Sequence, residues 1–244
     1  MTSFKGKTIF IAGASSDIGL ASAVALSNEG AELILHYASL EGLERLKAKF
    51  SDAKHEFVQM NFGEVDKIEK TFSDLFKNKP LDGLINCVGV RSRRPLKLLK
   101  HNHLLEVMTL NYFSFIELLR VALKKGCYKT GFSVVQVSSI AAQAGGSAVT
   151  AYAASKAASD AAIRSLAKEL WGKGVRLNSI VCGQVASRAY SKLLEVNKED
   201  KVLDRQYLGL VNTSEVAEII LFLLSERARR ISGSFIPADG GYLQ

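Results

Sequence analysis

Short apolar runs alternate with longer amphipathic stretches along most of this chain. The short runs are typical of buried strands, and the longer stretches place apolar residues three and four positions apart, as amphipathic helices do. The predicted strands are Thr8–Ala12, Glu32–His36, His55–Met60, Leu81–Asn86, Ser133–Val137, Val175–Val181 and Gly233–Pro237. The predicted helices run from the turn after the first strand to about Glu29, and over residues 40–50, 65–76, 104–125, 152–170 and 213–226.

Strands that alternate with helices indicate an α/β fold with a parallel sheet. We expect a doubly wound, seven-stranded, mostly parallel sheet with helices on both faces, formed by residues 1–244 as a single domain. Ligands of such sheets bind at the carboxyl ends of the strands, where the strand order reverses. The polar residues that follow the apolar runs are therefore the candidates for a site.

Composition excludes several classes of protein. No apolar run approaches the roughly 20 residues of a membrane span, and the first residues lack the apolar core of a signal peptide. Cys87, Cys127 and Cys182 are odd in number and far apart, which argues against a disulfide framework and a metal site and favours a cytoplasmic location. The net charge of +8 is spread along the chain, so we expect neither nucleic acid nor a membrane as a partner.

The turn after the first strand reads Gly13-Ala-Ser-Ser-Asp-Ile-Gly19 and opens a helix. Strand, glycine turn and helix form the context of a dinucleotide-binding site, because glycine admits a pyrophosphate and the helix start offers unpaired N–H groups. Ser15 and Ser16 add hydroxyl donors. The alternative is a tight turn in which Asp17 serves the helix N-terminus.

The end of the second strand bears on the choice of cofactor. An acidic residue there would bind a ribose 2′-hydroxyl and repel a 2′-phosphate. The positions hold His36, Tyr37, Ala38 and Ser39, with no acid before Glu41. This favours NADP(H) over NAD(H), although His36 also fits a strand-end residue that contacts solvent.

Ser139, Tyr152 and Lys156 carry the candidate chemistry. Tyr152 and Lys156 are four residues apart in a helical pattern, which stacks them on one face, and Ser139 follows a strand. A nearby ammonium favours a phenolate and lowers the phenol pKa, so that the phenol exchanges a proton with a substrate oxygen. The serine hydroxyl bonds the same oxygen. The alternative is an ordinary pair of helix-surface residues.

Two further stretches flank this site. Arg91-Ser-Arg-Arg-Pro-Leu-Lys97 is the densest basic run and leaves a strand end on the ligand side. It is either a solvated loop or a guide for an anionic substrate, such as a phosphopantetheine carrier or a sugar nucleotide. Residues 184–211 have weak periodicity and lie where a substrate lid is expected.

These motifs in this order resemble the short-chain dehydrogenase/reductase family, over nearly the whole chain. The resemblance implies a Rossmann-type fold and an NAD(P)-dependent oxidoreductase. It implies that Asn111, Ser139, Tyr152 and Lys156 are catalytic and that no metal takes part. In it, Lys156 holds the nicotinamide ribose and Asn111 holds a water. The implied cofactor-binding residues are Gly13, Ser15, Ser16, Asp17, Ile18, Gly19, His36, Ala38, Ser39, Asn61, Phe62, Asn86, Val88, Gly89, Tyr152, Lys156, Val185 and Ser187.

The chain departs from the family pattern at three places. Asp17 replaces the middle glycine of the first motif, Cys87-Val88 replaces Asn-Ala, and Cys182 replaces the proline of Pro-Gly. None of these changes removes a catalytic group.

The chain looks most like the bacterial 3-oxoacyl-carrier-protein reductases, in which Lys129 and Lys173 would meet an acidic carrier. This implies a small carbonyl or alcohol substrate, either anionic or carrier-bound, and a homo-oligomer, a tetramer or a dimer. A sugar or sugar-nucleotide dehydrogenase of the same fold and a non-catalytic dinucleotide sensor are the alternatives.

Overall fold

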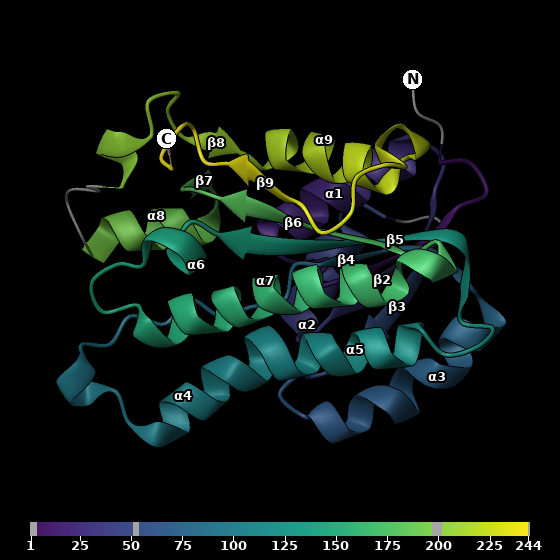
Figure 1. Ribbon diagram of the computed structural model, residues 1–244, viewed down its shortest axis with the longest axis horizontal. Coiled ribbons are helices and arrows are strands. Elements are labelled where there is room, and N and C mark those ends of the chain that lie inside the picture. Colours follow the sequence, from purple (N-terminus) through teal and green to yellow (C-terminus); the bar gives the residue numbers. More distant parts are fainter. Residues whose placement is uncertain (1–3, 51–53, 197–201, 244) are drawn as a thin grey trace.

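The computed structural model describes residues 4–50, 54–196 and 202–243. Its main sheet has seven strands, all parallel, in the order β3-β2-β1-β4-β5-β6-β9 (Figure 1). The strands are β1 (Thr8–Ala12), β2 (Glu32–Tyr37), β3 (Glu56–Gln59), β4 (Leu81–Asn86), β5 (Tyr128–Ser139), β6 (Arg176–Cys182) and β9 (Phe235–Ala238). The order reverses between β1 and β4, as the predicted doubly wound fold requires.

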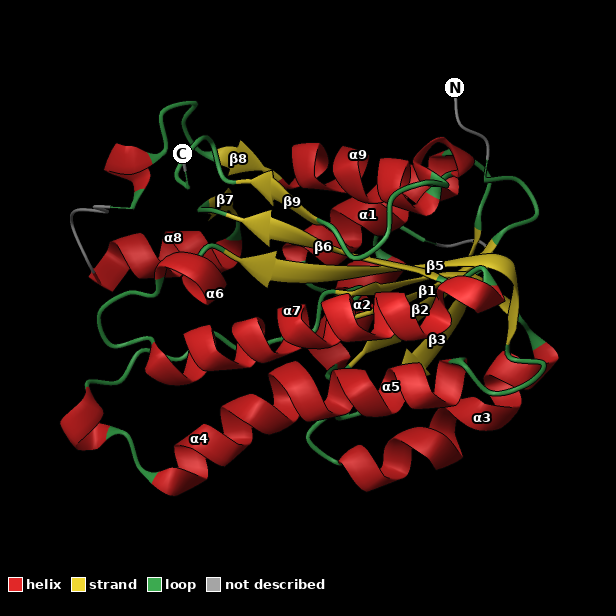
Figure 2. Ribbon diagram, viewed as in Figure 1, coloured by secondary structure: helices red, strands yellow, loops and turns green. Residues whose placement is uncertain are grey.

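Helices cover both faces of this sheet (Figure 2). The α-helices are α1 (Asp17–Asn28), α2 (Leu40–Lys47), α3 (Ile68–Asn78), α4 (His101–Met108), α5 (Ser114–Ala122), α6 (Ala141–Ala144), α7 (Thr150–Leu170), α8 (Arg188–Val196) and α9 (Thr213–Leu224). Single 3₁₀ turns lie at Val65–Lys67, Leu96–Leu98, Trp171–Lys173, Leu203–Arg205 and Glu226–Ala228. The predicted α/β architecture is confirmed.

Alternation of side chains along the strands divides the core into two layers. Ile9 and Ile11 of β1 pack with Leu26 of α1 and Ile220 of α9 on one face. Phe10, between them in sequence, packs on the other face with α3, α5 and α7. Successive strand residues point to opposite faces, so a continuous apolar run is what a strand covered on both sides requires.

The structure differs from the sequence prediction in the long helix over residues 104–125. This helix begins earlier, at His101, and is interrupted by a π-helical turn over Thr109–Phe113 that separates α4 from α5. Asn111 lies in this turn. A π turn inserts an extra residue without changing the apolar pattern, so the periodicity of the sequence did not show it.

The segment predicted as a lid contains regular structure. It holds β7 (Val185–Ala186), α8 and the turn at Leu203–Arg205, and β7 pairs in parallel with β8 (Val211–Asn212). Residues 197–201 of the predicted lid lie outside the described residues. The small β7–β8 sheet was not predicted, because two-residue strands leave no periodic signal.

Candidate active site

A crevice of about 1200 Å³ opens at the carboxyl ends of the central strands. Its wall includes Ser139 from the end of β5, Tyr152 and Lys156 from α7, and Cys182 from the end of β6. The topology therefore brings together the three residues that the sequence singled out for chemistry, and it does so at the edge where α/β sheets bind ligands.

The Ser139 hydroxyl lies within hydrogen-bonding reach of the Tyr152 phenol. Burial raises the pKa of Tyr152, while the Ser139 hydrogen bond and the nearby charge of Arg91 act to lower it, and burial outweighs them. The sequence analysis expected Lys156 to lower this pKa. In the structure the desolvation of the phenol is the larger effect, so the phenol holds its proton at neutral pH.

Lys156 is buried and lines the crevice. Its Nζ donates a hydrogen bond of 2.9 Å to the backbone carbonyl of Val137 in β5. Burial lowers the pKa of the ammonium. The carbonyl bond holds the amine at the strand end, within the crevice and one helical turn from the phenol.

Asn111 is fully buried and holds the loop after β4 in place. Its side-chain amide accepts a 2.8 Å hydrogen bond from the Val90 N–H and donates a 3.1 Å bond to the Val90 carbonyl. It also donates to the Ser155 hydroxyl of α7 at 2.8 Å. A Cβ added at Gly89 would lie 3.1 Å from Lys156 Nζ and 3.3 Å from Asn111 Oδ1, so the amide and the amine meet at this glycine.

Asp160 lies one helical turn beyond Lys156 and is also buried. Its carboxylate accepts hydrogen bonds of 2.9 Å from the Ser138 hydroxyl of β5 and from the Ser179 hydroxyl of β6. Burial raises its pKa more than these hydroxyls and the charge of Lys156 lower it. The carboxylate thereby ties α7 to the two strands whose ends form the crevice.

The glycine turn fits a pyrophosphate. Ser16 is the N-cap of α1, and its hydroxyl accepts from the Gly19 N–H at 3.1 Å. No group of the described chain accepts from the backbone N–H groups of Asp17 and Ile18, and both residues line the crevice. A Cβ at Gly19 would lie 2.3 Å from the Gly13 carbonyl, so only glycine allows the turn to close this tightly on the helix.

His36 supports this turn from below. The Gly13 N–H donates to His36 Nδ1 at 2.9 Å, so Nε2 carries the ring proton and donates to the Met60 carbonyl at 2.9 Å. The ring packs on Phe62, with 4.3 Å between ring centroids. Burial lowers the pKa of His36 to about 4. Both nitrogens are used within the protein, and His36 does not line the crevice.

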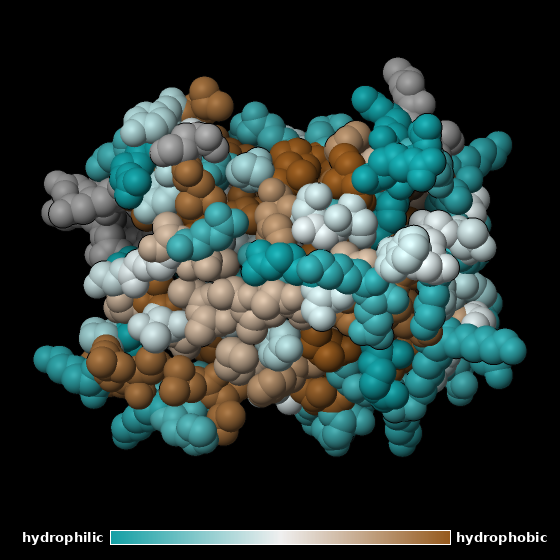
Figure 3. Space-filling model, in the orientation of Figure 1, coloured by the Kyte–Doolittle hydropathy of each residue, from teal (hydrophilic) through white to brown (hydrophobic). Residues whose placement is uncertain are grey.

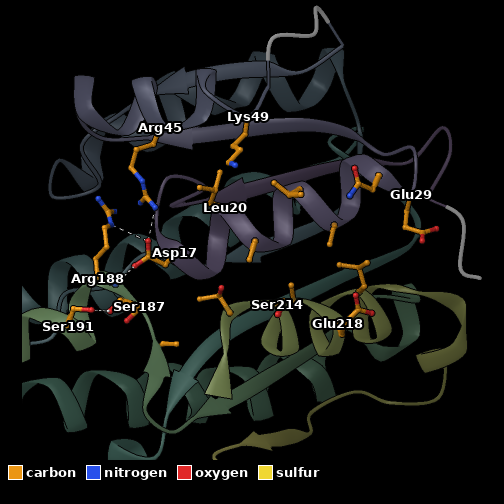
Figure 4. A pocket seen from close by; sticks show the side chains of 18 residues that line it. Asp17, Leu20, Glu29, Arg45, Lys49, Ser187, Arg188, Ser191, Ser214 and Glu218 are labelled. Atoms are coloured by element: carbon orange, nitrogen blue, oxygen red, sulfur yellow. Dashed lines mark hydrogen bonds and ion pairs between the residues drawn. The ribbon is translucent and has the colours of Figure 1, made fainter. Parts of the chain in front are cut away.

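Asp17 points away from the turn, toward two arginines (Figure 4). Its Oδ1 lies 2.7 Å from Arg45 Nη2 and 3.1 Å from Arg188 Nε, and its Oδ2 accepts from the Arg188 backbone N–H at 2.7 Å. Burial would raise the pKa of this carboxyl, but the bonds from Arg188 and Arg45 outweigh it and hold the pKa below its usual value. Arg188 also reaches Glu41 at 3.0 Å. These ion pairs border a second hollow of about 820 Å³, floored by α1 and α9.

The other residues predicted to bind a cofactor lie around the crevice at different depths. Those that line it are Ser16, Asp17, Ile18, Gly89, Tyr152, Lys156, Val185 and Ser187. Those that do not are Gly13, Ser15, Gly19, His36, Ala38, Ser39, Asn61, Phe62, Asn86 and Val88. Asn86 is buried, donating to Gln136 at 2.8 Å and accepting from the Val88 N–H at 3.2 Å, so it shapes the strand end.

Comparisons with known proteins agree with this geometry. The family model described as enoyl-(acyl carrier protein) reductase matches residues 13–243. 3-oxoacyl-[acyl-carrier-protein] reductase FabG of Thermotoga maritima is 30% identical and aligns over 97% of this chain and 98% of its own length. The solved short-chain dehydrogenase/reductase (glucose/ribitol dehydrogenase) of Brucella melitensis superposes with a TM-score of 0.90 at 27% identity, covering 99% of this chain and 98% of its own. The chain belongs to the short-chain dehydrogenase/reductase family.

As a short-chain dehydrogenase/reductase, the protein is an oxidoreductase. Its relatives also include 2-dehydro-3-deoxy-D-gluconate 5-dehydrogenase of Bacillus subtilis, 26% identical over 99% of this chain and 96% of its own length. Within the described residues, no helix combines the length and apolar character needed to cross a membrane.

Two departures of this short-chain dehydrogenase/reductase from its family's motifs place thiols at the crevice. Cys87 and Cys182 both line it, and burial raises the pKa of each to about 12. These thiols therefore stay protonated and are poor nucleophiles.

Sequence reasoning missed Asp160 and the contacts of Arg45 and Arg188. An aspartate within an alanine-rich helix, four residues after Lys156, was the available signal for Asp160. The ion pairs of Asp17 join residues 28 and 171 positions apart, for which one sequence offers no signal.

Proposed function

We propose that the protein interconverts a ketone and a secondary alcohol by hydride transfer with a nicotinamide cofactor. The observation that carries the proposal is the Tyr152 phenol, within hydrogen-bonding reach of the Ser139 hydroxyl and held on the helix of Lys156 in one crevice. In the direction of reduction, Tyr152 donates its proton to the carbonyl oxygen, and Ser139 bonds that oxygen as charge develops. Lys156, held at the strand end by the Val137 carbonyl, would support the phenol and the cofactor ribose.

The residues present fit a dinucleotide. The unpaired N–H groups of Asp17 and Ile18 would meet its pyrophosphate, and the bound nicotinamide would supply the hydride. NADP(H) is favoured over NAD(H), because Ala38 and Ser39 at the end of β2 carry no acid and the carboxylate of Glu41 is paired with Arg188. Titration with NADPH and NADH, followed by fluorescence, tests the preference; tighter binding of NADH would reverse it.

Two substrate classes fit the family. The relative from Thermotoga maritima supports a 3-oxoacyl thioester, and the relative from Bacillus subtilis supports a sugar-type substrate. The fold does not support the expectation that Lys129 meets an acidic carrier near the site. Lys129 lies near the amino end of β5 and is paired with Asp82 at 2.7 Å, whereas the crevice lies at the carboxyl end of that strand.

The Tyr152→Phe variant tests the chemistry. It keeps the ring and removes the proton donor, so we expect unchanged NADPH binding and a loss of turnover of at least about 100-fold. Absorbance of NADPH with a panel of ketones, sugars and alcohols measures turnover. If the cofactor binds to wild-type protein but none of these substrates reacts, a dinucleotide sensor replaces the enzyme; an active variant would mean that another group is the acid.

We also propose a cytoplasmic homo-oligomer. In Figure 3, apolar side chains gather over α4 and the segment before it. Leu96, Leu98 and Leu105 are exposed in this region, and Phe113 is exposed in the π-helical turn that follows α4. Burying such a patch against a second copy would remove it from water. Light scattering distinguishes a dimer or tetramer from a monomer of 26.5 kDa.

A further inference from the structure

The loop after β4 displays two arginines in the crevice. Arg91 and Arg93 line its wall, and Arg94, between them and the turn at Pro95, does not. The loop is anchored on both sides of this pair. The Asn111 amide holds both backbone groups of Val90, and the Arg94 N–H donates to the Ala148 carbonyl at 2.7 Å. The backbone of the basic run is therefore anchored to Asn111 and to Ala148, while the side chains of Arg91 and Arg93 stay exposed to solvent at the crevice, as a solvated loop also would have them.

The Arg91 guanidinium lines the same crevice as the reacting groups. Its Nη1 lies 3.3 Å from Oε1 of Gln184, at the opposite side of the crevice. Its charge also acts on the Tyr152 phenol, against the larger effect of burial. A ligand group bound by Arg91 would thus lie close to the carbonyl that Tyr152 protonates.

Most N–H donors of the Arg91 guanidinium are available for a ligand. Across residues 4–50, 54–196 and 202–243, neither Arg91 nor Arg93 has a carboxylate partner, whereas Arg45 and Arg188 both pair with Asp17. A guanidinium carries five N–H donors in a fork that matches a carboxylate. One bond of 3.3 Å to an amide leaves most of them for a ligand.

The charges of the crevice favour an anion. Its two acidic wall residues are Asp17 and Glu41, and both are ion-paired to arginines. Arg91 and Arg93 remain as positive groups of the wall that have no carboxylate partner among the described residues. Clefts lined by one sign of charge concentrate ligands of the opposite sign.

We propose that Arg91, with Arg93 beside it, binds a carboxylate of the substrate, so that the substrate is a keto acid, or the corresponding hydroxy acid, with its carboxylate a few bonds from the reacting carbon. This inference rests on the proposed ketone–alcohol chemistry. A carboxylate is favoured over the phosphate of a pantetheine arm, since that phosphate stands at the far end of a long arm, whereas Arg91 lines the crevice that holds Tyr152 and its charge acts on the phenol.

Matched substrates test the proposal. We expect acetoacetate and 4-oxopentanoate to be reduced with a kcat/KM at least about tenfold above that of their methyl esters, because a charged hydrogen bond is lost in the ester. Arg91→Gln should lower kcat/KM for the acids by about 10- to 100-fold and leave the esters within about threefold. Arg91→Lys should restore part of the acid preference. Arg94→Gln, on the same loop but outside the crevice, is the matched control and should behave as wild type.

Three results decide against the proposal. One is equal use of acids and esters, with Arg91→Gln affecting both alike. Another is an Arg91 dependence confined to the acetoacetyl thioester of phosphopantetheine and absent for the free acids and for the pantetheine thioester, which would assign the arginine to a carrier phosphate. The third result concerns binding and applies if no ketone is reduced, in which case the proposed function fails.

Binding of acetoacetate is then measured by its effect on the thermal unfolding temperature. A rise in wild type that Arg91→Gln abolishes supports the anion site, and the absence of a rise overturns it.

Discussion

His36 makes the stability of this protein depend on pH. The neutral ring accepts from the Gly13 N–H and donates to the Met60 carbonyl, and it is packed against aromatic rings. A proton added at Nδ1 turns the acceptor into a second donor that faces an N–H, and it also places a charge in the core. Protonation is therefore opposed in the folded state and free in the unfolded chain.

The size of the effect follows from the two pKa values. Burial lowers the pKa of His36 from 6.5 to about 4. A folded-state pKa below the unfolded one means that the unfolded state binds the proton first, so stability is lost as pH falls from about 6.5 and the loss is complete below about 4. The full difference corresponds to about 3 kcal/mol, of which about 2 kcal/mol is already lost at pH 5.

Urea unfolding followed by circular dichroism at pH 7.5, 6.5, 5.5 and 5.0 measures this dependence. We expect His36→Gln to be less stable than wild type at pH 7.5, and to lose about 2 kcal/mol less than wild type between pH 7.5 and 5. His101→Gln, at the exposed start of α4, leaves the contacts of His36 in place and should keep the wild-type curve. The reasoning is refuted if His36→Gln and wild type lose the same free energy over this range.

Two further variants test the supports of the site. Asp160→Ala leaves the hydroxyls of Ser138 and Ser179 without their acceptor, so we expect the free energy of unfolding in urea to fall by about 2–4 kcal/mol. Asp160→Asn keeps an acceptor and should be closer to wild type. An Asp160→Ala variant of unchanged stability would contradict this reasoning. Gly19→Ala places a methyl group 2.3 Å from the Gly13 carbonyl and should weaken NADPH binding by at least about tenfold while α7 and its chemistry stay intact, as measured by titration. Unchanged affinity would show that the turn does not hold the cofactor.

The sequence predicted the site best where its residues are close together in the chain. Tyr152 and Lys156 are one helical turn apart, and Ser139 is joined to them by a short segment, so the helical period and the strand end placed all three correctly. The doubly wound parallel sheet was also predicted, because strands that alternate with helices are joined by crossovers that make neighbouring strands parallel. The Ser139–Tyr152 contact required only these two facts.

The sequence analysis was wrong about properties that depend on how deeply a side chain is buried. The spacing of Tyr152 and Lys156 suggested a lowered phenol pKa, but the cost of desolvation depends on how deep the crevice is, and no pattern reports depth. His36 was placed beside a cofactor because it ends β2. Its ring is instead buried under the glycine turn and accepts from the Gly13 N–H, so it is not the solvent-contacting strand-end residue that the sequence analysis had left open.

Asp17 shows how a residue that looks unsuited to a phosphate turn is accommodated. A carboxylate next to an incoming pyrophosphate would repel it if it were unpaired. Here two guanidiniums neutralise the carboxylate, and the same carboxylate accepts from the first backbone N–H of α8. Because α8 belongs to the segment expected to cover the substrate, the replacement of glycine by aspartate joins the cofactor turn to that segment. Replacing glycine by aspartate therefore adds little unpaired negative charge to the turn, and it gives the turn a direct contact with α8.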